Sequence, residues 1–483
     1  MRYKITLLIL LFGYYSNSQT FVNTEADIPN LYNSITALGY ANGDEYLDLY
    51  IAGNQENSFD AGGLYLYDNG TYTLSTTSNL PVLSLGSARW GDIDNDGDMD
   101  ILIQGYNGTT DESVTKLYEN NNDGTFTALE IGLPQTYLGE VAFSDINNDG
   151  FLDIAITGFV LSTSDFITKI FKNNGNSSFT ELSGNSIPGM NFGRIKFADY
   201  NNDGYEDFVL SGMNMVTYEF FVAVFTNNQD ETFTEDTSID LTQNWLGDTE
   251  WADYNNDGNI DLIVSGTGGD SGMERTTILY KNNGDNTFSQ LNSAVFPGVS
   301  HSSIEWADFD NDDDLDVLII GTTSAPGEGN YTYTIHTNNG DDTFTASETA
   351  VLNVSYYGDA DSGDIDNDGL TDLVISGFNN LDIPESSVYM NQTGVSISEV
   401  IVTDLQVFPN PVIGKKLTIT SNISQWNFDK SDLTIYSVTG KKVYHKNINS
   451  RIQTIDLSIL KSGIYMLELK QNKKTDVRKL IIP

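Results

Sequence analysis

A nine-residue acidic segment recurs along the chain, and its residue types are suited to binding a hard cation. Oxygen atoms at positions 1, 3, 5 and 9, with the backbone carbonyl of position 7, can surround one Ca²⁺, which takes about six to eight oxygen ligands. Glycine at position 6 permits the sharp turn that this requires. We therefore predict about six Ca²⁺ sites in copies of D-x-[DN]-x-D-[GD]-x-x-D that begin at Asp92, Asp145, Asp199, Asp253, Asp308 and Asp364.

Each predicted site takes its ligands from positions 1, 3, 5, 7 and 9 of the segment. Only the backbone is expected to bind at position 7, so any residue type is acceptable there. The copy that begins at Asp308 has Asp313 in place of the glycine. In chain order, the predicted metal ligands are Asp92, Asp94, Asp96, Asp98, Asp100, Asp145, Asn147, Asp149, Phe151, Asp153, Asp199, Asn201, Asp203, Tyr205, Asp207, Asp253, Asn255, Asp257, Asn259, Asp261, Asp308, Asp310, Asp312, Asp314, Asp316, Asp364, Asp366, Asp368, Leu370 and Asp372.

Other interpretations of these segments explain less of their composition. Acidic residues favour tight turns, but Asn-Gly or Asp-Gly alone would suffice for a turn. Three or four acids within nine residues repel one another unless a cation lies between them. Mg²⁺ would demand a stricter octahedron, and an EF-hand loop needs a glutamate at position 12, where Ile103 stands in the first intact copy.

A degraded copy of the segment runs from Tyr40 to Asp48. Tyr40 and Glu45 stand where aspartate and glycine are expected. Asn42, Asp44 and Asp48 remain, and they are weaker candidate ligands for a seventh ion.

The acidic residues are concentrated in one part of the chain. The whole chain has 483 residues, no cysteine, three histidines and a formal net charge of −45. Residues 19–403 hold 62 acidic and 8 basic residues, whereas 404–483 hold 6 and 13. Such a charge argues against nucleic acid and anionic membrane surfaces as partners. The lack of cysteine excludes disulfides, zinc–thiolate sites and thiol nucleophiles.

The first residues are typical of an export signal, which we place at 1–18. Arg2 and Lys4 precede an apolar stretch from Ile5 to Phe12, and small residues follow before Gln19. The stretch is too short to span a bilayer, and no other segment has transmembrane length. A buried N-terminal strand is the alternative. The signal predicts a secreted protein.

The acidic segments mark seven repeats with a period of 52 to 56 residues. Each repeat contains four short β-rich runs separated by turn residues and shows no helical periodicity. The third run ends in a double asparagine, as at Asn120 and Asn121. Four strands per repeat are typical of a propeller blade. We therefore predict an all-β fold, with a seven-bladed β-propeller over 19–397 whose N-terminal strand (19–24) completes blade 7, followed by a small β-sandwich over 398–483.

On these loops and strands the chain resembles the FG-GAP/VCBS repeats of integrin-type calcium-binding propellers. The resemblance covers about residues 20–397, although the literal Phe-Gly and Gly-Ala-Pro signatures are not well kept. It implies a Ca²⁺-stabilised extracellular scaffold that serves in adhesion and, in some members, in carbohydrate binding or cleavage.

The last eighty residues resemble the type A C-terminal sorting domain of the type IX secretion system. The matching features are Pro409-Asn410-Pro411, the Thr439-Gly440-Lys441 turn, the strand beginning at Ile464 and the basic Lys479-Leu480-Ile481 ending. The resemblance implies that 398–483 contacts the secretion machinery, and that the protein is exported to the cell surface or released. A generic sugar-binding sandwich is the alternative.

The predicted ligand-binding face lies opposite the acidic loops. In a propeller, the loops between strands 1 and 2 and between strands 3 and 4 occupy one face, and the loops between strands 2 and 3 and between successive blades occupy the other. Aromatic residues that precede strand 1 either stack on sugars or pack the blades, while charged residues on strand 1 either bind a polar ligand or pair with one another. The two candidate sets are Tyr137, Phe192, Trp245 and Tyr357, and Arg89, Lys196, Glu250 and Glu305.

Three classes of function are compatible with these features. The favoured one is a secreted, non-catalytic calcium-binding propeller that binds an extracellular glycan or a surface protein in adhesion. The alternatives are a Ca²⁺-dependent polysaccharide lyase or glycoside hydrolase, and a structural surface-layer protein. No nucleophile elbow and no HExxH motif is present in the sequence.

Overall fold

All described regular elements of the protein are β-strands. A computed structural model describes residues 20–56, 58–268, 274–324, 330–347, 352, 354–392, 405–408, 412, 415–421, 431–437, 441–448, 452–461, 463–471 and 474–482. The predicted signal and the Pro409-Asn410-Pro411 opening lie outside these residues. The chain divides into two compact units, 1–395 and 396–483. Within the described part, no helix is long and apolar enough to cross a membrane.

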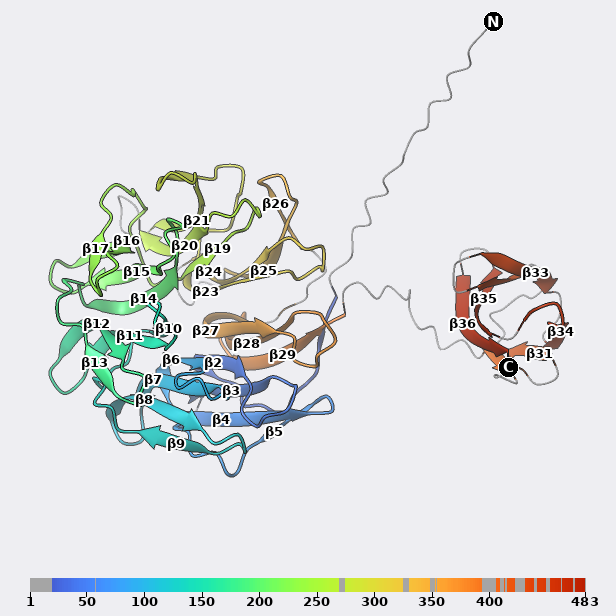
Figure 1. The fold of residues 1–483 in the computed structure, drawn as a ribbon, viewed down its shortest axis with the longest axis horizontal. Helices are drawn as coiled ribbons and strands as arrows, with labels where there is room; N and C mark the ends of the chain where they lie inside the picture. Colours follow the sequence, from blue (N-terminus) through green and yellow to red (C-terminus); the bar gives the residue numbers. More distant parts are fainter. Residues whose placement is uncertain are drawn as a thin grey trace, which may run out of the picture. The chain divides into compact units, whose positions relative to one another are not determined.

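The first unit contains seven antiparallel sheets, which we call blades 1 to 7 (Figure 1). Blade 5 has five named strands because its first strand is split in two. Blades 1 to 3 are formed by β2 (Tyr32–Gly39), β3 (Asp48–Gln55), β4 (Ser58–Asp68) and β5 (Thr71–Leu74); β6 (Ser84–Gly91), β7 (Asp100–Asn107), β8 (Glu112–Asn120) and β9 (Phe126–Leu129); and β10 (Val141–Ser144), β11 (Asp153–Val160), β12 (Asp165–Asn173) and β13 (Phe179–Glu181).

The other four blades repeat this order. Blades 4 to 7 are formed by β14 (Met190–Ala198), β15 (Asp207–Asn214), β16 (Glu219–Asn227) and β17 (Phe233–Glu235); β18 (Asn244–Trp245), β19 (Thr249–Ala252), β20 (Asp261–Gly268), β21 (Glu274–Asn282) and β22 (Phe288–Gln290); β23 (Ser300–Ala307), β24 (Asp316–Thr322), β25 (Tyr331–Asn338) and β26 (Phe344–Ala346); and β27 (Val354–Gly363), β28 (Asp372–Asn379), β29 (Pro384–Asn391) and β1 (Phe21–Asn23).

The hydrophobic core lies between the blades rather than within them. Second strands are apolar because both of their faces are covered, and the first six residues of β7 are all buried. Each of seven apolar clusters joins one blade to the next, and one of them brings Leu49 and Ile51 of blade 1 against Val374 and Val388 of blade 7. The sheets therefore form a closed ring, and the predicted all-β propeller is confirmed.

The N-terminal strand is part of the last blade. In β1, Phe21 pairs antiparallel with Asn391 and Asn23 with Tyr389. The Asn23 side chain also donates to Ser387 Oγ at 3.1 Å. Blade 7 thus takes its outer strand from the other end of the unit.

The second unit contains two antiparallel sheets around one apolar cluster. Leu433, Ile435, Leu467 and Leu469 are fully buried in it. The sheets consist of β30 (Leu405–Phe408), β31 (Lys416–Ser421) and β34 (Ile452–Asp456), and of β33 (Lys442–Ile448), β32 (Ser431–Ser437), β35 (Gly463–Gln471) and β36 (Lys474–Ile482).

Antiparallel pairing fixes two opposite faces of the propeller. The first strand of each blade lines a central channel and leads into the acidic loop, so all acidic loops lie on one face, which we call the loop face. The connections between strands 2 and 3 and between successive blades lie on the other, which we call the mouth face.

Candidate functional site

Blade 3 shows how one acidic loop is built. The side chain of Asp145, at position 1, accepts the N–H groups of Asp149 and Gly150 at 3.0 and 2.8 Å. Asn147 Oδ1 accepts the Asp149 N–H as well, and Asp149 Oδ1 accepts that of Phe151 at 3.1 Å. These bonds curl the loop and hold the oxygens of positions 1, 3 and 5 on its inner side, as a cation-binding loop requires.

Three of the loops gather carboxylate oxygens within 4.8 Å of one another. They are the loops of blades 2, 6 and 7, and the clusters are Asp92, Asp94 and Asp96; Asp308, Asp310 and Asp316; and Asp364, Asp366 and Asp372. Blades 3 to 5 have asparagine at position 3, so an amide oxygen replaces one carboxylate there.

The acidic loops pass a further test of fit to a cation. Asp310 Oδ1 and Asp366 Oδ1 are buried atoms with no hydrogen-bond donor among the described residues. A buried carboxylate oxygen without a donor is costly, and a bound cation removes that cost. An all-oxygen set of carboxylates, amides and carbonyls suits Ca²⁺ better than a transition metal.

The aspartate at position 9 also has a structural task. In blade 3, Asp153 Oδ1 accepts the N–H of Asn173 at 2.7 Å and Oδ2 accepts that of Ile146 at 3.1 Å. The side chain thereby ties the acidic loop to the third strand, while each oxygen keeps a second lone pair for a cation. Burial raises the pKa of Asp153 to about 7, so its ionised form needs a positive neighbour.

Blade 1 differs because side chains within its loop hydrogen-bond to one another. Asn42 Nδ2 donates to Asp44 Oδ2 at 2.9 Å, so an amide group occupies the carboxylate oxygen that would face a cation. Asp48 keeps its structural task and accepts the N–H groups of Ala41 and Tyr67. The weaker candidate ligands are therefore close together, but the structure already gives them partners.

The asparagine that ends the third strand of six blades joins neighbouring blades. It is the first of a double asparagine in five of them and is followed by Gln392 in blade 7. Asn282 Nδ2 donates to the carbonyl of Tyr200, in the acidic loop of the preceding blade, at 2.7 Å and to that of Ile260 at 3.1 Å. Five further blades repeat the inter-blade bond, and we call this residue the latch asparagine. The other latches are Asn120, Asn173, Asn227, Asn338 and Asn391.

On strand 1, the four predicted charged residues face the channel, and three of them form ion pairs there. The nine charged residues lining a cavity of about 400 Å³ are six acids and three bases. Glu140 is the centre, with Arg89 Nη2 at 2.5 Å and Lys196 Nζ at 3.1 Å from its Oε1. Lys196 also contacts Glu250. Burial opposes ionisation of Glu140, but Lys196 and Arg89 outweigh it and lower its pKa to about 2.

Glu305 differs from the other channel acids because its side chain has no hydrogen bond or ion pair to a described residue. Burial raises its pKa, and the charges of Asp361 and Glu250 raise it further. Burial also raises the pKa of Glu250 to about 7, in spite of Lys196. The acidic side of the channel is thus short of positive charge.

A second layer of channel residues lies two positions before the first, and the sequence analysis did not single it out. Its side chains accept the N–H of the next blade's strand 1, which would otherwise be an open sheet edge. These bonds run from Val141 to Ser87, Ile195 to Glu140, Ile304 to Asp248, Ala360 to Ser303 and Thr36 to Asp359, at 2.9 to 3.3 Å. Two blades depart from this pattern, with Ile35 and Arg194 at the position.

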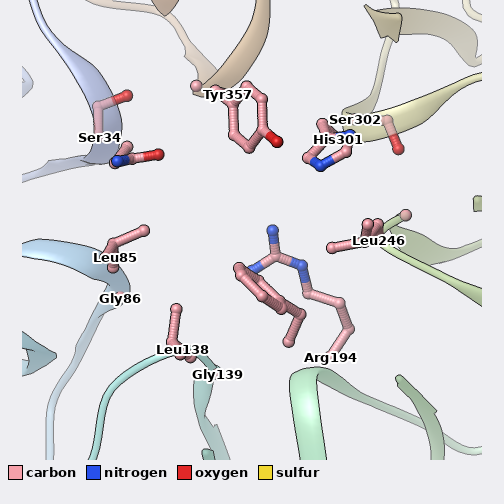
Figure 2. Close-up of a pocket in the computed structure, with 14 residues that line it drawn as sticks. Ser34, Leu85, Gly86, Leu138, Gly139, Arg194, Leu246, His301, Ser302 and Tyr357 are labelled. Carbon is pink, nitrogen blue, oxygen red and sulfur yellow. The ribbon is translucent and has the colours of Figure 1, made fainter. Parts of the chain in front are cut away.

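On the mouth face, seven residues in left-handed backbone conformation surround the opening of the channel. Their φ angles lie between +48° and +55°, and β-bulges displace the register of strand 1 beside most of them. Gly139, which follows one of them, is required because a Cβ would lie 2.0 Å from the Thr157 carbonyl oxygen. We call this ring the collar: Asn33, Leu85, Leu138, Phe192, Leu246, His301 and Tyr357 (Figure 2).

Of the four aromatic candidates, the structure brings two to the collar. Phe192 and Tyr357 line its cavity of about 90 Å³, and His301 stacks beside Tyr357 with ring centroids 4.1 Å apart. Tyr137 and Trp245 precede the collar by one residue and pack in aromatic clusters of the blades instead. They are not among the residues that line the cavity.

The sequence contained a signal for part of what was missed. Residues two apart on a strand face the same side, so Arg89 and Lys196 pointed to a second layer two positions earlier. The latch asparagines were visible as a repeated double asparagine, but their partners lie in another repeat and become evident only when the blades are side by side.

Two known families match the chain. FG-GAP-like repeats match residues 41–103, 106–156, 199–264 and 253–319, and a secretion system C-terminal sorting domain matches 406–483. No curated protein matches.

Solved structures with a similar fold are distant in sequence. The α-L-arabinanase of Penicillium chrysogenum is 12% identical with a TM-score of 0.38, covering 63% of this chain and 92% of its own. PorZ, a surface component of the type IX secretion system of Porphyromonas gingivalis, is 13% identical with a TM-score of 0.36, covering 94% and 59%. The biofilm matrix protein Bap1 of V. cholerae is 12% identical with a TM-score of 0.40, covering 90% and 96%.

Proposed function

Because the chain carries FG-GAP-like repeats followed by a type IX secretion sorting domain, we propose that it is a calcium-stabilised extracellular propeller that binds a glycan or a surface protein. The sorting domain implies contact with the secretion machinery and export to the cell surface or beyond. The export signal proposed for 1–18 would carry the chain across the first membrane.

The observation that supports calcium is the repeated oxygen cradle. Carboxylates meet within 4.8 Å, and buried oxygens such as Asp310 Oδ1 lack a donor. In the absence of cysteine, cations at the loop face would give an exported propeller the rigidity that disulfides give other secreted proteins. Asp92 to Asp100 and the five equivalent segments are the proposed ligands, and the loop of blade 1 is not proposed to bind.

A binding role is supported by the exposed apolar side chains of the mouth face. Phe59, Val216, Tyr218, Val295 and Leu381 are 64 to 88% exposed. All five lie in or beside connections on that face. Exposed apolar residues around a channel opening are typical of a ligand-binding surface.

Metal analysis and a binding screen test the two halves of this proposal. The purified protein, equilibrated in Ca²⁺ and freed of unbound metal, should contain about six Ca²⁺ per chain, one for each intact loop. A stoichiometry near zero would contradict the calcium sites.

A glycan array, read together with assays for new reducing ends and for absorbance at 235 nm, tests the role of the mouth face. We expect retention of a glycan without product. Turnover would instead favour the lyase or glycoside hydrolase, whereas the absence of any ligand would favour a structural surface-layer protein.

A further inference from the structure

Arg194 differs from the residues at the equivalent position of most other blades, which accept a hydrogen bond from the next blade. Ser87, Glu140, Asp248, Ser303 and Asp359 each accept an N–H of the next blade. A guanidinium has no acceptor, so it cannot perform this task. Departures from a local rule that the rest of a fold obeys are expected at functional sites.

At blade 5 the fold compensates for this departure. The N–H of Thr249, which Arg194 cannot bind, donates to Asp248 Oδ1 of its own blade at 2.9 Å. Asp248 Oδ2 accepts the Ile304 N–H at 3.0 Å, so this carboxylate is fixed at both oxygens. Closure of the ring therefore does not require Arg194.

The same aspartate orients the arginine. Arg194 Nε lies 3.7 Å from Asp248 Oδ1, and Asp248 is 7% exposed. That contact uses one edge of the guanidinium and leaves the two terminal nitrogens directed into the collar (Figure 2). A guanidinium held by its Nε edge presents a planar fork that matches a carboxylate.

The collar around this fork is apolar, half-buried and strained. Leu138, Phe192, Leu246 and Tyr357 adopt φ angles of +50° to +55°, which cost bulky residues free energy that asparagine, present as Asn33, largely avoids. Their side chains are neither fully buried in a blade nor fully exposed. The face of a pyranose ring packs well on such a surface, whereas a bare ion gains nothing from it.

Arginine is concentrated at this end of an otherwise acidic unit. Residues 19–403 contain three arginines, and all lie near the channel. Arg89 lines it, and Arg275 Nε donates at 3.0 Å to Ser300, the neighbour of His301 in the collar. Glu140 and Asp359, which lie in the same layer as Arg194, are already held by cations or backbone N–H groups, so they leave Arg194 available.

We infer that the collar binds the terminal uronic acid of an acidic glycan, with the sugar carboxylate on the fork of Arg194 and the ring against Phe192 and Tyr357. The cavity of about 90 Å³ admits the carboxylate end of one sugar rather than a chain passing through. This inference rests on the proposed glycan-binding function and names the ligand class of that same mouth.

Ligand-observed NMR titration of the calcium-loaded protein tests it with two matched probes, a methyl galacturonoside and the corresponding neutral methyl galactoside. We expect the uronoside to bind roughly tenfold tighter or more, because only the uronoside can form a charge-assisted bidentate pair with the guanidinium. Arg194→Gln should remove that advantage, and Arg194→Lys should restore only part of it because lysine lacks the fork.

Arg275→Gln is the matched control, because it removes the same charge on the same face without touching the cavity. Its affinity for the uronoside should stay within about threefold of wild type. Melting temperature and Ca²⁺ content, measured for every variant, show that the ring is intact.

Three results would overturn the inference. They are equal affinity for the two sugars, an unchanged affinity in Arg194→Gln, and binding of acetate or of a peptide's terminal carboxylate as tight as that of the uronoside. Equal affinity for the two sugars would leave the proposed glycan-binding function standing. If a calcium-loaded, folded protein binds neither probe, this inference fails, and the glycan array decides the proposed function separately.

Discussion

The two ends of the innermost strands differ in how much they vary from blade to blade. At the loop face, the acidic segment, the position 9 aspartate and the latch asparagine recur in six blades. At the collar, the seven equivalent positions carry asparagine, three leucines, phenylalanine, histidine and tyrosine. The backbone repeats at both ends, since every collar residue has nearly the same φ.

This difference separates what builds the ring from what uses it. A residue that every blade needs is explained by the contact that every blade makes, as Asp153 and Asn282 are. A residue type that appears once, such as Arg194, cannot be explained by blade construction. The comparison therefore predicts that changes at the loop face act on stability, while changes at the collar act on binding.

Removal of calcium should give the largest loss of stability. If stability did not fall, the distinction between the loop face and the collar would be wrong. With six sites linked to folding, an excess of EDTA should lower the melting temperature of the propeller by at least about 10 °C. Scanning calorimetry with and without chelator measures this, and restored Ca²⁺ should reverse it. An unchanged melting curve would show that the loop face is held by its hydrogen bonds alone.

Asn282→Ala tests the loop face without touching a predicted ligand. It removes two bonds to carbonyls, one of them in the neighbouring blade, and leaves the Gly284 N–H without its acceptor. We expect a loss of about 2 to 3 kcal/mol in the free energy of unfolding, measured by denaturant titration. Asn283→Ala, at the second asparagine, should cost under about 1 kcal/mol, because its hydrogen bonds to Thr287 and Ser289 are exposed and water can replace them. Equal costs would contradict the latch.

A pair of substitutions at position 5 sharpens the comparison within the loop face. Asp368→Asn should lower the Ca²⁺ content by about one ion per chain and destabilise the protein by roughly 1 to 2 kcal/mol. Asp44→Asn, at the same position of blade 1, should leave the Ca²⁺ content unchanged because Asn42 already occupies its carboxylate. Loss of an ion in both variants would mean that blade 1 binds calcium.

The smallest expected effect has the opposite sign and lies in the channel. Burial, Asp361 and Glu250 raise the pKa of Glu305 well above its ordinary value of 4.5, so the folded protein favours the protonated form. The stability that this gives is present at low pH and lost as pH rises through the folded pKa.

Glu305→Gln should therefore raise the melting temperature at pH 8 by roughly 1 to 2 °C and have a smaller effect at pH 5, because the raised pKa of Glu305 favours its protonated form as the pH falls. Exposed Glu235→Gln should have no effect at either pH. A lower melting temperature of Glu305→Gln at pH 8 would show that the carboxylate has a stabilising cation in the channel.

The fold could be read from the sequence because each repeat carries its own evidence. Seven acidic segments at a steady spacing, with four short strands apiece, indicated the propeller that the structure shows. Residues such as Asp92 and Asp96 could be placed side by side because they lie in one short loop, where local chain geometry decides.

The mouth could be read only in part, because it is made of residues from seven repeats. The four predicted aromatic residues mix two positions, because Tyr137 and Trp245 stand two residues before a glycine and Phe192 and Tyr357 one residue before it. Only the second position, at the β-bulge, has the left-handed conformation of the collar. A bulge leaves no reliable mark in a single sequence. Arg194 could not be singled out from the sequence, because its departure from the pattern is evident only when the hydrogen bonds of the other blades are known.

The pairing of β1 with β29 has a consequence for how the protein folds. The side chain of Asn23 reaches Ser387 across 364 residues, and the N–H of Gln392 donates to the Thr20 carbonyl at 2.7 Å. Contacts so distant in sequence slow folding, because chain entropy is lost before they form. The ring cannot be completed until the whole propeller has been synthesised. A nascent chain therefore carries β1 as a strand without its partner β29, and such an unpaired strand invites aggregation, which favours a chaperone-held chain before export.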